Sequence, residues 1–119
     1  MIAVIFELTP APGRKQEYLD LATALKSELD RTDGFISIER FESLSNPGHF
    51  VSLSFWRDEE AVKQWRTQAH HRESQRQGRN GVFADYRLRV ASVLRDYGLN
   101  ARAAAPADSK RAHGAQTAS

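Results

Sequence analysis

The fold of this chain is decided by residues 35–57, whose sequence is FISIERFESLSNPGHFVSLSFWR. Two runs rich in β-branched and aromatic residues, Phe35 to Leu44 and His49 to Arg57, flank the cluster Ser45 to Gly48. Serine, asparagine, proline and glycine are the residues that form tight turns. The segment is therefore predicted to be a β-hairpin, and the rest of the chain is arranged on either side of it.

The segment before the hairpin contains a strand followed by a helix. Residues Ile2 to Thr9 are mostly β-branched and aromatic and are closed by the turn Pro10 to Gly13, which predicts a strand. Beyond Gly13 the apolar residues recur every three or four positions, the spacing of one face of a helix. They are Tyr18, Leu21, Ala22, Leu25 and Leu29, and the helix is predicted to end before Thr32-Asp33-Gly34.

The segment after the hairpin again contains a helix and then a strand. Asp58 is predicted to cap the helix, whose apolar stripe consists of Val62, Trp65 and Ala69. The stretch His70 to Asn80 is polar and loses the helical spacing. Val82 to Tyr97 is predicted to be a long strand, with Tyr86, Leu88 and Val90 on one side.

The order β-α-β-β-α-β predicts an α+β fold of the ferredoxin-like kind, a four-stranded antiparallel sheet with both helices on one face. The other face is also expected to be apolar, because both sides of these strands are. In the first strand Ala3 and Ile5 are opposite to Phe6, and in the third Leu53 and Phe55 are opposite to Trp56. A sheet with one face in water normally alternates polar and apolar residues. We therefore expect a second copy of the chain to cover this other face and form a homodimer.

Residues 1–98 are expected to form one domain, and residues 99–119 a disordered C-terminal tail. From Ala101 onward the chain has no leucine, isoleucine, valine or aromatic residue, so burial cannot offset the entropy of ordering it. The tail also holds the whole net charge of +2, because Arg102, Lys110 and Arg111 stand against Asp108. The domain itself is neutral, so no nucleic-acid binding is expected.

The composition excludes several other classes of protein. The chain has no cysteine, which removes disulfides, thiolate metal sites and cysteine nucleophiles and fits a reducing compartment. The apolar run Ile2 to Phe6 stops at Glu7 with no basic segment before it, so neither a signal peptide nor a membrane span is expected. The chain is therefore expected to be cytoplasmic.

Three segments together resemble the antibiotic biosynthesis monooxygenase family. They are FWRDEEAVKQWR at residues 55–66, AHHR at residues 69–72 and YRLRV at residues 86–90. The resemblance covers Met1 to about Gly98 and implies a dimeric α+β barrel, in which two sheets face each other and the helices lie outside. It also implies a pocket between sheet and helices in each subunit, with Trp65 in its wall.

The activity implied first by the resemblance is that of a monooxygenase without cofactor or metal, which oxidises an electron-rich aromatic such as a quinol or an anthrone with O₂. Two alternatives remain open. One is haem binding or degradation with His71 as axial ligand. The other is a non-catalytic dimeric barrel that binds a small hydrophobic ligand. The latter is favoured by Ala61, because quinol-oxidising relatives have an asparagine at this place.

Trp65 is the first candidate site residue, because an indole supplies a flat apolar wall and one N–H donor. Its spacing with Val62 and Ala69 is also that of a core stripe, so a structural role stays open.

His70 and His71 are candidates for the base, because imidazole accepts a proton near neutral pH. At about 100° per residue, Arg72 is more nearly in line with Trp65 than either histidine, unless the helix breaks near Gln68. Two adjacent histidines without further ligands at suitable spacing are a poor metal site.

Arg66 and Arg72 are cations that can stabilise a phenolate or superoxide, although a solvated helix face is the alternative. The resulting hypothesis assigns catalytic roles to His71, Trp65 and Arg72, and substrate contacts to Trp65, Phe55, Arg66 and His70. On the sheet, Arg87 and Arg89 are candidates to pair across strands with Glu7 and Glu39 inside the dimer barrel.

Overall fold

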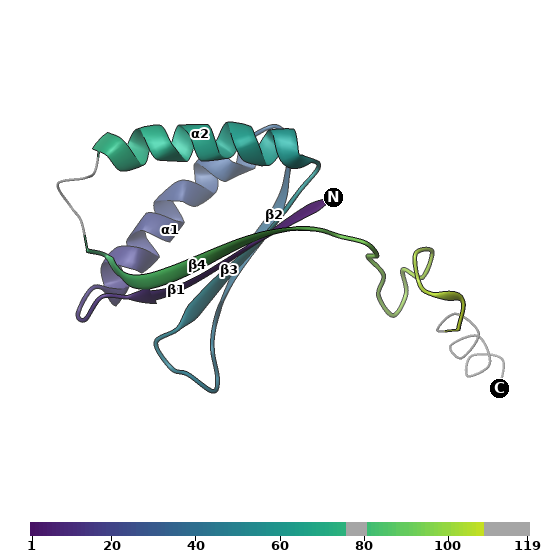
Figure 1. Cartoon of the computed structure of the whole chain (residues 1–119), viewed down its shortest axis with the longest axis horizontal. Coiled ribbons are helices and arrows are strands. Elements are labelled where there is room, and N and C mark those ends of the chain that lie inside the picture. Colours follow the sequence, from purple (N-terminus) through teal and green to yellow (C-terminus); the bar gives the residue numbers. More distant parts are fainter. Residues whose placement is uncertain (76–80, 109–119) are drawn as a thin grey trace.

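The structure, a computed structural model, describes residues 1–75 and 81–108, with the side chains of residues 1–68 and 81–108. The four strands form one antiparallel sheet in the order β2-β3-β1-β4, and both helices lie on the same face of it (Figure 1). The ferredoxin-like α+β fold is confirmed. Its elements are β1 (Ile2–Pro10), α1 (Lys15–Asp30), β2 (Phe35–Glu42), β3 (Phe50–Trp56), α2 (Glu59–Gln75) and β4 (Phe83–Ser92).

Two element ends differ clearly from the predicted ones. β4 ends at Ser92 instead of Tyr97, because Ser92 is paired with Ile2 and the next donor, Val93 N–H, bonds the carbonyl of Met1 at 3.0 Å. Beyond that point β1 offers no partner residue. α2 continues unbroken to Gln75, although its apolar spacing is lost earlier, since glutamine, arginine and glutamate are good helix formers.

The hydrophobic core lies between the helices and the face of the sheet that they cover, here called the helix face. Two clusters of buried residues fill it, and Leu8 and Trp56 are their fully buried large side chains. Burying such a side chain contributes about 2–3 kcal/mol. The first cluster contains Leu29, Trp56, Ala61 and Val62, and the second contains Leu8, Tyr18 and Phe50.

The start of α2 is fixed by charged side chains. Asp58 caps the helix as predicted, because its Oδ1 accepts a hydrogen bond from the backbone N–H of Ala61 at 2.9 Å. Arg57 donates to both Asp58 and Asp33, at 3.2 and 3.1 Å. The guanidinium therefore joins the beginning of α2 to the loop that follows α1.

Acid is expected to weaken this helix start. The Ala61 N–H and then Arg57 hold the pKa of Asp58 below its ordinary value of 3.8, so the folded chain binds fewer protons than the unfolded one. The cap therefore stabilises the fold above that ordinary value, and this contribution disappears as pH falls through the lowered pKa. Asp58→Asn keeps a hydrogen-bond acceptor that does not titrate, so this variant does not lose its cap in acid. As pH falls from about 5 to about 3, the wild type should lose the advantage of its charged cap, and the melting temperatures of the two proteins should converge. A constant difference over this range would contradict the assignment.

The opposite face of the sheet, here called the open face, is covered by no described element. Its centre is apolar, with Ile5, Leu53 and Phe55 partly buried, as the sequence predicts. Its end near β4 is charged, and Arg89 forms an ion pair there with Glu7. The cross-strand pairing considered for these two residues is confirmed.

Beyond β4 the chain leaves the domain. Residues 93–108, here called the C-terminal arm, run away from sheet and helices (Figure 1). Within the described residues, no helix is both long enough and apolar enough to cross a bilayer.

Candidate functional site

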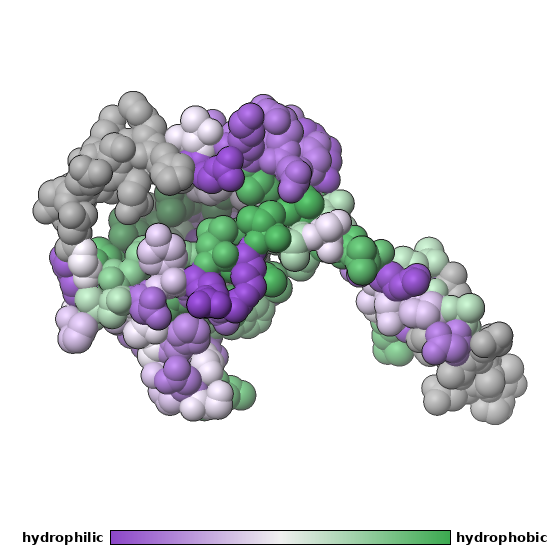
Figure 2. All heavy atoms as spheres, viewed as in Figure 1, coloured by the Kyte–Doolittle hydropathy of each residue, from purple (hydrophilic) through white to green (hydrophobic). Residues whose placement is uncertain are grey.

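The helix face is left partly uncovered where β4 passes under α2. The register places Tyr86, Leu88 and Val90 of β4 opposite Leu8, Phe6 and Val4, so all of these side chains lie on the helix face. Tyr86, Leu88 and Val90 nevertheless remain exposed. Figure 2 shows the surface hollowed between α2 and β4, with apolar side chains along the hollow. We call this region the helix-side recess.

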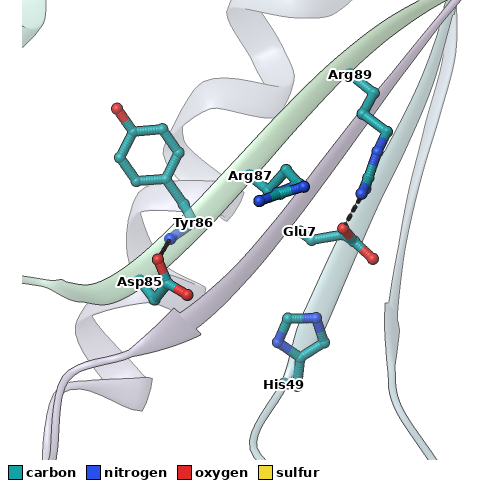
Figure 3. A pocket seen from close by; sticks show the side chains of 6 residues that line it. All are labelled: Glu7, His49, Asp85, Tyr86, Arg87 and Arg89. Carbon is teal, nitrogen blue, oxygen red and sulfur yellow. Dashed lines mark hydrogen bonds and ion pairs between the residues drawn. The ribbon is translucent and has the colours of Figure 1, made fainter.

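Aromatic rings form one end of the helix-side recess. The ring of Phe6 lies 5.8 Å from that of Phe83 and 5.7 Å from that of Tyr86, centroid to centroid. Tyr18 of α1 extends this group, 6.1 Å from Phe83. The side chain of Tyr86 points away from those of Glu7 and Arg87 (Figure 3), which places a phenol hydroxyl at an otherwise apolar surface. Such a group can donate a hydrogen bond to a substrate oxygen.

Trp65 is partly buried on α2 and packs against the first core cluster. Its ring lies 6.3 Å from that of Trp56 at an interplanar angle of 32°. The Nε1–H of Trp56 donates to the hydroxyl of Ser54 at 2.9 Å, so the inner of the two indoles is held in place. Trp65 therefore has a packed side and an accessible side, which suits both the pocket wall and the structural anchor considered above.

The other predicted site residues are not all brought together. Phe55 lies on the open face, opposite to Trp65, because side chains alternate along β3 and its neighbour Trp56 is on the helix face. Arg66 is exposed on α2. The side chains of His70, His71 and Arg72 lie outside the described residues. The helix carrying them has no break near Gln68.

The aromatic group around Phe6 was not singled out from the sequence. A signal was present, because Tyr86, Leu88 and Val90 alternate on one side of a strand whose other side carries Asp85, Arg87 and Arg89. An excess of apolar residues on an edge strand indicates a surface that takes part in binding.

Tyr18 is buried in the second core cluster, with the Arg40 guanidinium near its hydroxyl. Burial raises the pKa of Tyr18, and the neighbouring Arg40 guanidinium counteracts part of this rise. A phenol with a raised pKa stays protonated at neutral pH, so Tyr18 is not suited to act as a base.

A second hollow, of about 180 Å³, lies on the open face. Its lining residues are Glu7, His49, Asp85, Tyr86, Arg87 and Arg89. Figure 3 shows Glu7 directed at Arg89 and the Tyr86 side chain turned away from both. His49 shares a hydrogen bond with Thr9 at 3.0 Å. Two carboxylates balance two guanidinium groups here, so the hollow has no strong preference for an anion. Throughout the described residues, no group of three histidine or carboxylate side chains could hold a metal ion.

Fold and recess together define a ferredoxin-like α+β domain with an apolar recess between sheet and helices. The family model of the antibiotic biosynthesis monooxygenases matches residues 1–77. The chain belongs to this family.

Two curated relatives match parts of the chain. A jasmonate monooxygenase, ABM, of Pyricularia oryzae is 52% identical over 93 residues, which are 78% of this chain and 43% of the relative. The protein YqjZ of Bacillus subtilis is 29% identical over 62 residues, which are 52% of this chain and 53% of the relative. The chain thus spans about half the length of the curated relatives that it matches.

Solved structures share the fold at low sequence identity. The protein Rv0793 of Mycobacterium tuberculosis superposes with a TM-score of 0.68 at 22% identity and covers 82% of this chain and 98% of its own. The heme-degrader MhuD of the same organism superposes with a TM-score of 0.66 at 16% identity, and the match covers 82% of this chain and 100% of MhuD.

Proposed function

We propose that this chain is a monooxygenase that inserts one atom of O₂ into a small, mostly apolar substrate bound in the helix-side recess. The observation that carries the proposal is the apolar face of β4 left exposed under α2 in a chain that belongs to a monooxygenase family. An apolar face burying a ligand contributes binding energy in proportion to the area removed from water, and water excluded from the site strengthens every polar contact inside it.

Jasmonate is the first candidate substrate. It is a cyclopentanone with a hydrocarbon side chain and a short carboxylate arm, and the relative that is 52% identical over 78% of this chain is named for it. The hydrocarbon part suits Leu88 and Val90, and the hydroxyl of Tyr86 suits the ketone oxygen. Arg66, exposed on α2, is the proposed cation for the carboxylate.

Hydroxylation of such a substrate requires an electron donor. Inserting one oxygen atom into a C–H bond reduces the other atom to water, which consumes two further electrons and two protons. A donor such as a reduced nicotinamide or flavin must therefore be present in the assay.

An electron-rich aromatic is the second candidate, favoured by the rings of Phe6, Phe83 and Tyr86 around the recess. Oxidation of the CH₂ group of an anthrone to a carbonyl removes four electrons, which reduces O₂ fully: one oxygen atom enters the product and the other leaves as water. No further donor is needed. In this scheme His71 or His70 takes the first proton, and Arg72 stabilises the anion.

We also propose that the active form is a homodimer. The support is the open face, where Ile5, Leu53 and Phe55 lie on a surface that no described element covers. A second copy placed on this face removes these side chains from water.

The experiment that tests the function uses the purified chain, oxygen-18 gas and two substrates. Jasmonate is supplied with and without NADPH plus a flavin reductase, and anthrone is supplied without a donor. We expect one product that carries a single oxygen-18 atom and forms faster than in the buffer blank. Blank rates with both substrates would overturn the proposal. A sharp Soret shift on mixing with hemin, without turnover, would favour haem binding instead.

A further inference from the structure

One row of side chains on the helix face changes from apolar to cationic across the sheet. The register sets Leu88 of β4 opposite Phe6 of β1. The row continues with Ser52 of β3 and then Arg40 of β2. It spans three strand spacings, about 14 Å. Its β4 end belongs to the apolar helix-side recess, and its β2 end is a guanidinium group.

Arg40 is held on the helix face and is not fully solvated. Its neighbour in the register, Ser52, is only 8% exposed, and Arg40 itself is half-buried. The Arg40 guanidinium is near the hydroxyl of Tyr18, which is a buried residue of α1. Since both helices lie on the same face of the sheet (Figure 1), the guanidinium is sheltered between that face and α1.

Tyr18 connects this guanidinium to the helix-side recess. The ring centroid of Tyr18 is 6.1 Å from that of Phe83, and Phe83 belongs to the aromatic group at one end of the recess. The hydroxyl of the same tyrosine is near Arg40. A single side chain therefore reaches from the recess to the cation.

Arg40 lacks the partner that a sheltered cation normally has. Among the side chains that the structure describes, no carboxylate forms an ion pair with Arg40, whereas Arg57 and Arg89 are both paired. Charges that are partly removed from water are usually paired. The hydroxyls of Tyr18 and Ser52 can add hydrogen-bond donors for an anion but no negative charge. An anionic ligand group would complete this arrangement.

We propose that Arg40, with Ser52 and Tyr18, binds the carboxylate of the substrate, so that the substrate class is a small amphipathic acid whose apolar part lies on β4. This inference rests on the proposed function, because it concerns the same recess. Arg66, the other cation proposed for a carboxylate, is exposed on α2, where water screens its charge. Arg66 therefore suits the approach of an acid, and Arg40 suits its retention.

The first test compares acids with their methyl esters, because esterification removes the charge and keeps the apolar part. The probes are jasmonic acid with methyl jasmonate, and anthraquinone-2-carboxylic acid with its methyl ester. Binding to the full wild-type chain is measured by isothermal titration calorimetry without an electron donor. We expect at least one acid to bind about tenfold more tightly than its ester. Equal affinities within both pairs, or no detectable binding of either acid, would overturn the proposal.

The second test replaces the arginine itself. Arg40→Gln should bind the acid about 10- to 100-fold more weakly and bind the ester as the wild type does. Arg40→Lys keeps the charge without the planar fork, so it should retain part of the preference for the acid. Arg31→Gln is the matched control, because it removes one positive charge at an exposed position after α1, and it should change neither affinity.

Thermal unfolding without ligand, monitored by circular dichroism, shows whether each variant is folded at the temperature of the titration. If Arg40→Gln is not folded, the comparison is made with Arg40→Lys. A preference for the acid that survives in folded Arg40 variants and disappears in Arg66→Gln would overturn the proposal.

Binding measured without turnover separates this proposal from the proposed function. A preference for the acid that depends on Arg40, in a chain that forms no oxygen-18 product, would support the carboxylate site and overturn the monooxygenase. Oxygen-18 product formed by Arg40→Gln at the wild-type rate, in a chain that does not distinguish acid from ester, would overturn the carboxylate site and leave the monooxygenase in place.

Discussion

Replacing Gly34 by alanine is expected to destabilise the fold by about 2–5 kcal/mol. Gly34 connects α1 to β2 with a φ of +84°, a conformation that side chains disfavour by about 1–2 kcal/mol. A Cβ atom at this position would also lie 2.5 Å from the Cβ of Ala61. Ala61 is almost fully buried at the start of α2, so the helix must move to relieve this clash. Such a movement costs about 1–3 kcal/mol more.

A matched control separates the two contributions. Gly48 has nearly the same φ, +88°, but a Cβ there would meet no atom within 4 Å. Gly48→Ala should therefore cost only the backbone contribution, about 1–2 kcal/mol. Urea denaturation of both variants measures the difference. Equal losses of unfolding free energy would mean that the approach of the α1–β2 loop to α2 does not restrict residue 34.

Replacing Trp65 by alanine is expected to lower kcat/KM about 100-fold, which corresponds to about 2.7 kcal/mol of transition-state stabilisation. Trp65 is partly buried and lies on Trp56. If Trp65 lines the proposed site, losing the indole removes a flat apolar wall and an N–H donor from it. The measurement is steady-state turnover of whichever substrate, jasmonate or anthrone, the wild type oxidises.

Trp65→Phe serves as the control, because it keeps an aromatic ring on Trp56 but removes the N–H. If the phenylalanine variant has a near wild-type KM and a reduced kcat, the indole N–H stabilises the transition state and not the bound substrate. If Trp65 is instead a structural anchor, alanine should lower the melting temperature strongly and leave kcat/KM unchanged at temperatures where the variant is folded. That result would remove Trp65 from the site.

Gly34 and Trp65 are related through the beginning of α2. The close contact of Gly34 with Ala61 fixes the beginning of α2, and the cap by Asp58 fixes the direction of its first turn. Trp65 follows on the same helix, one turn beyond Ala61 and Val62, which are held in the core. The place of Trp65 against Trp56 is therefore set by packing at the helix start.

Much of the candidate site could not be obtained from the sequence. The family resemblance selected Trp65, and the alternation in β4 placed Tyr86 with Leu88, but neither indicated that Phe6 and Phe83 would complete an aromatic group with Tyr86. Phe55 was assigned to the substrate alongside Trp65, whereas β3 directs it to the opposite face. The catalytic roles of His71 and Arg72 stay predictions, because their side chains lie outside the described residues.

The sequence by itself determined the order of the elements and their local ends. Spacings of two and of three to four residues, the turn at Ser45 to Gly48 and the cap at Asp58 are properties of neighbouring residues, so they can be recognised in the chain alone. The tertiary structure decided which strand edge stays bare, where β4 loses its partner beyond Met1, and that Glu7 meets Arg89. These features depend on pairing between residues far apart in sequence, and local spacing does not encode that register.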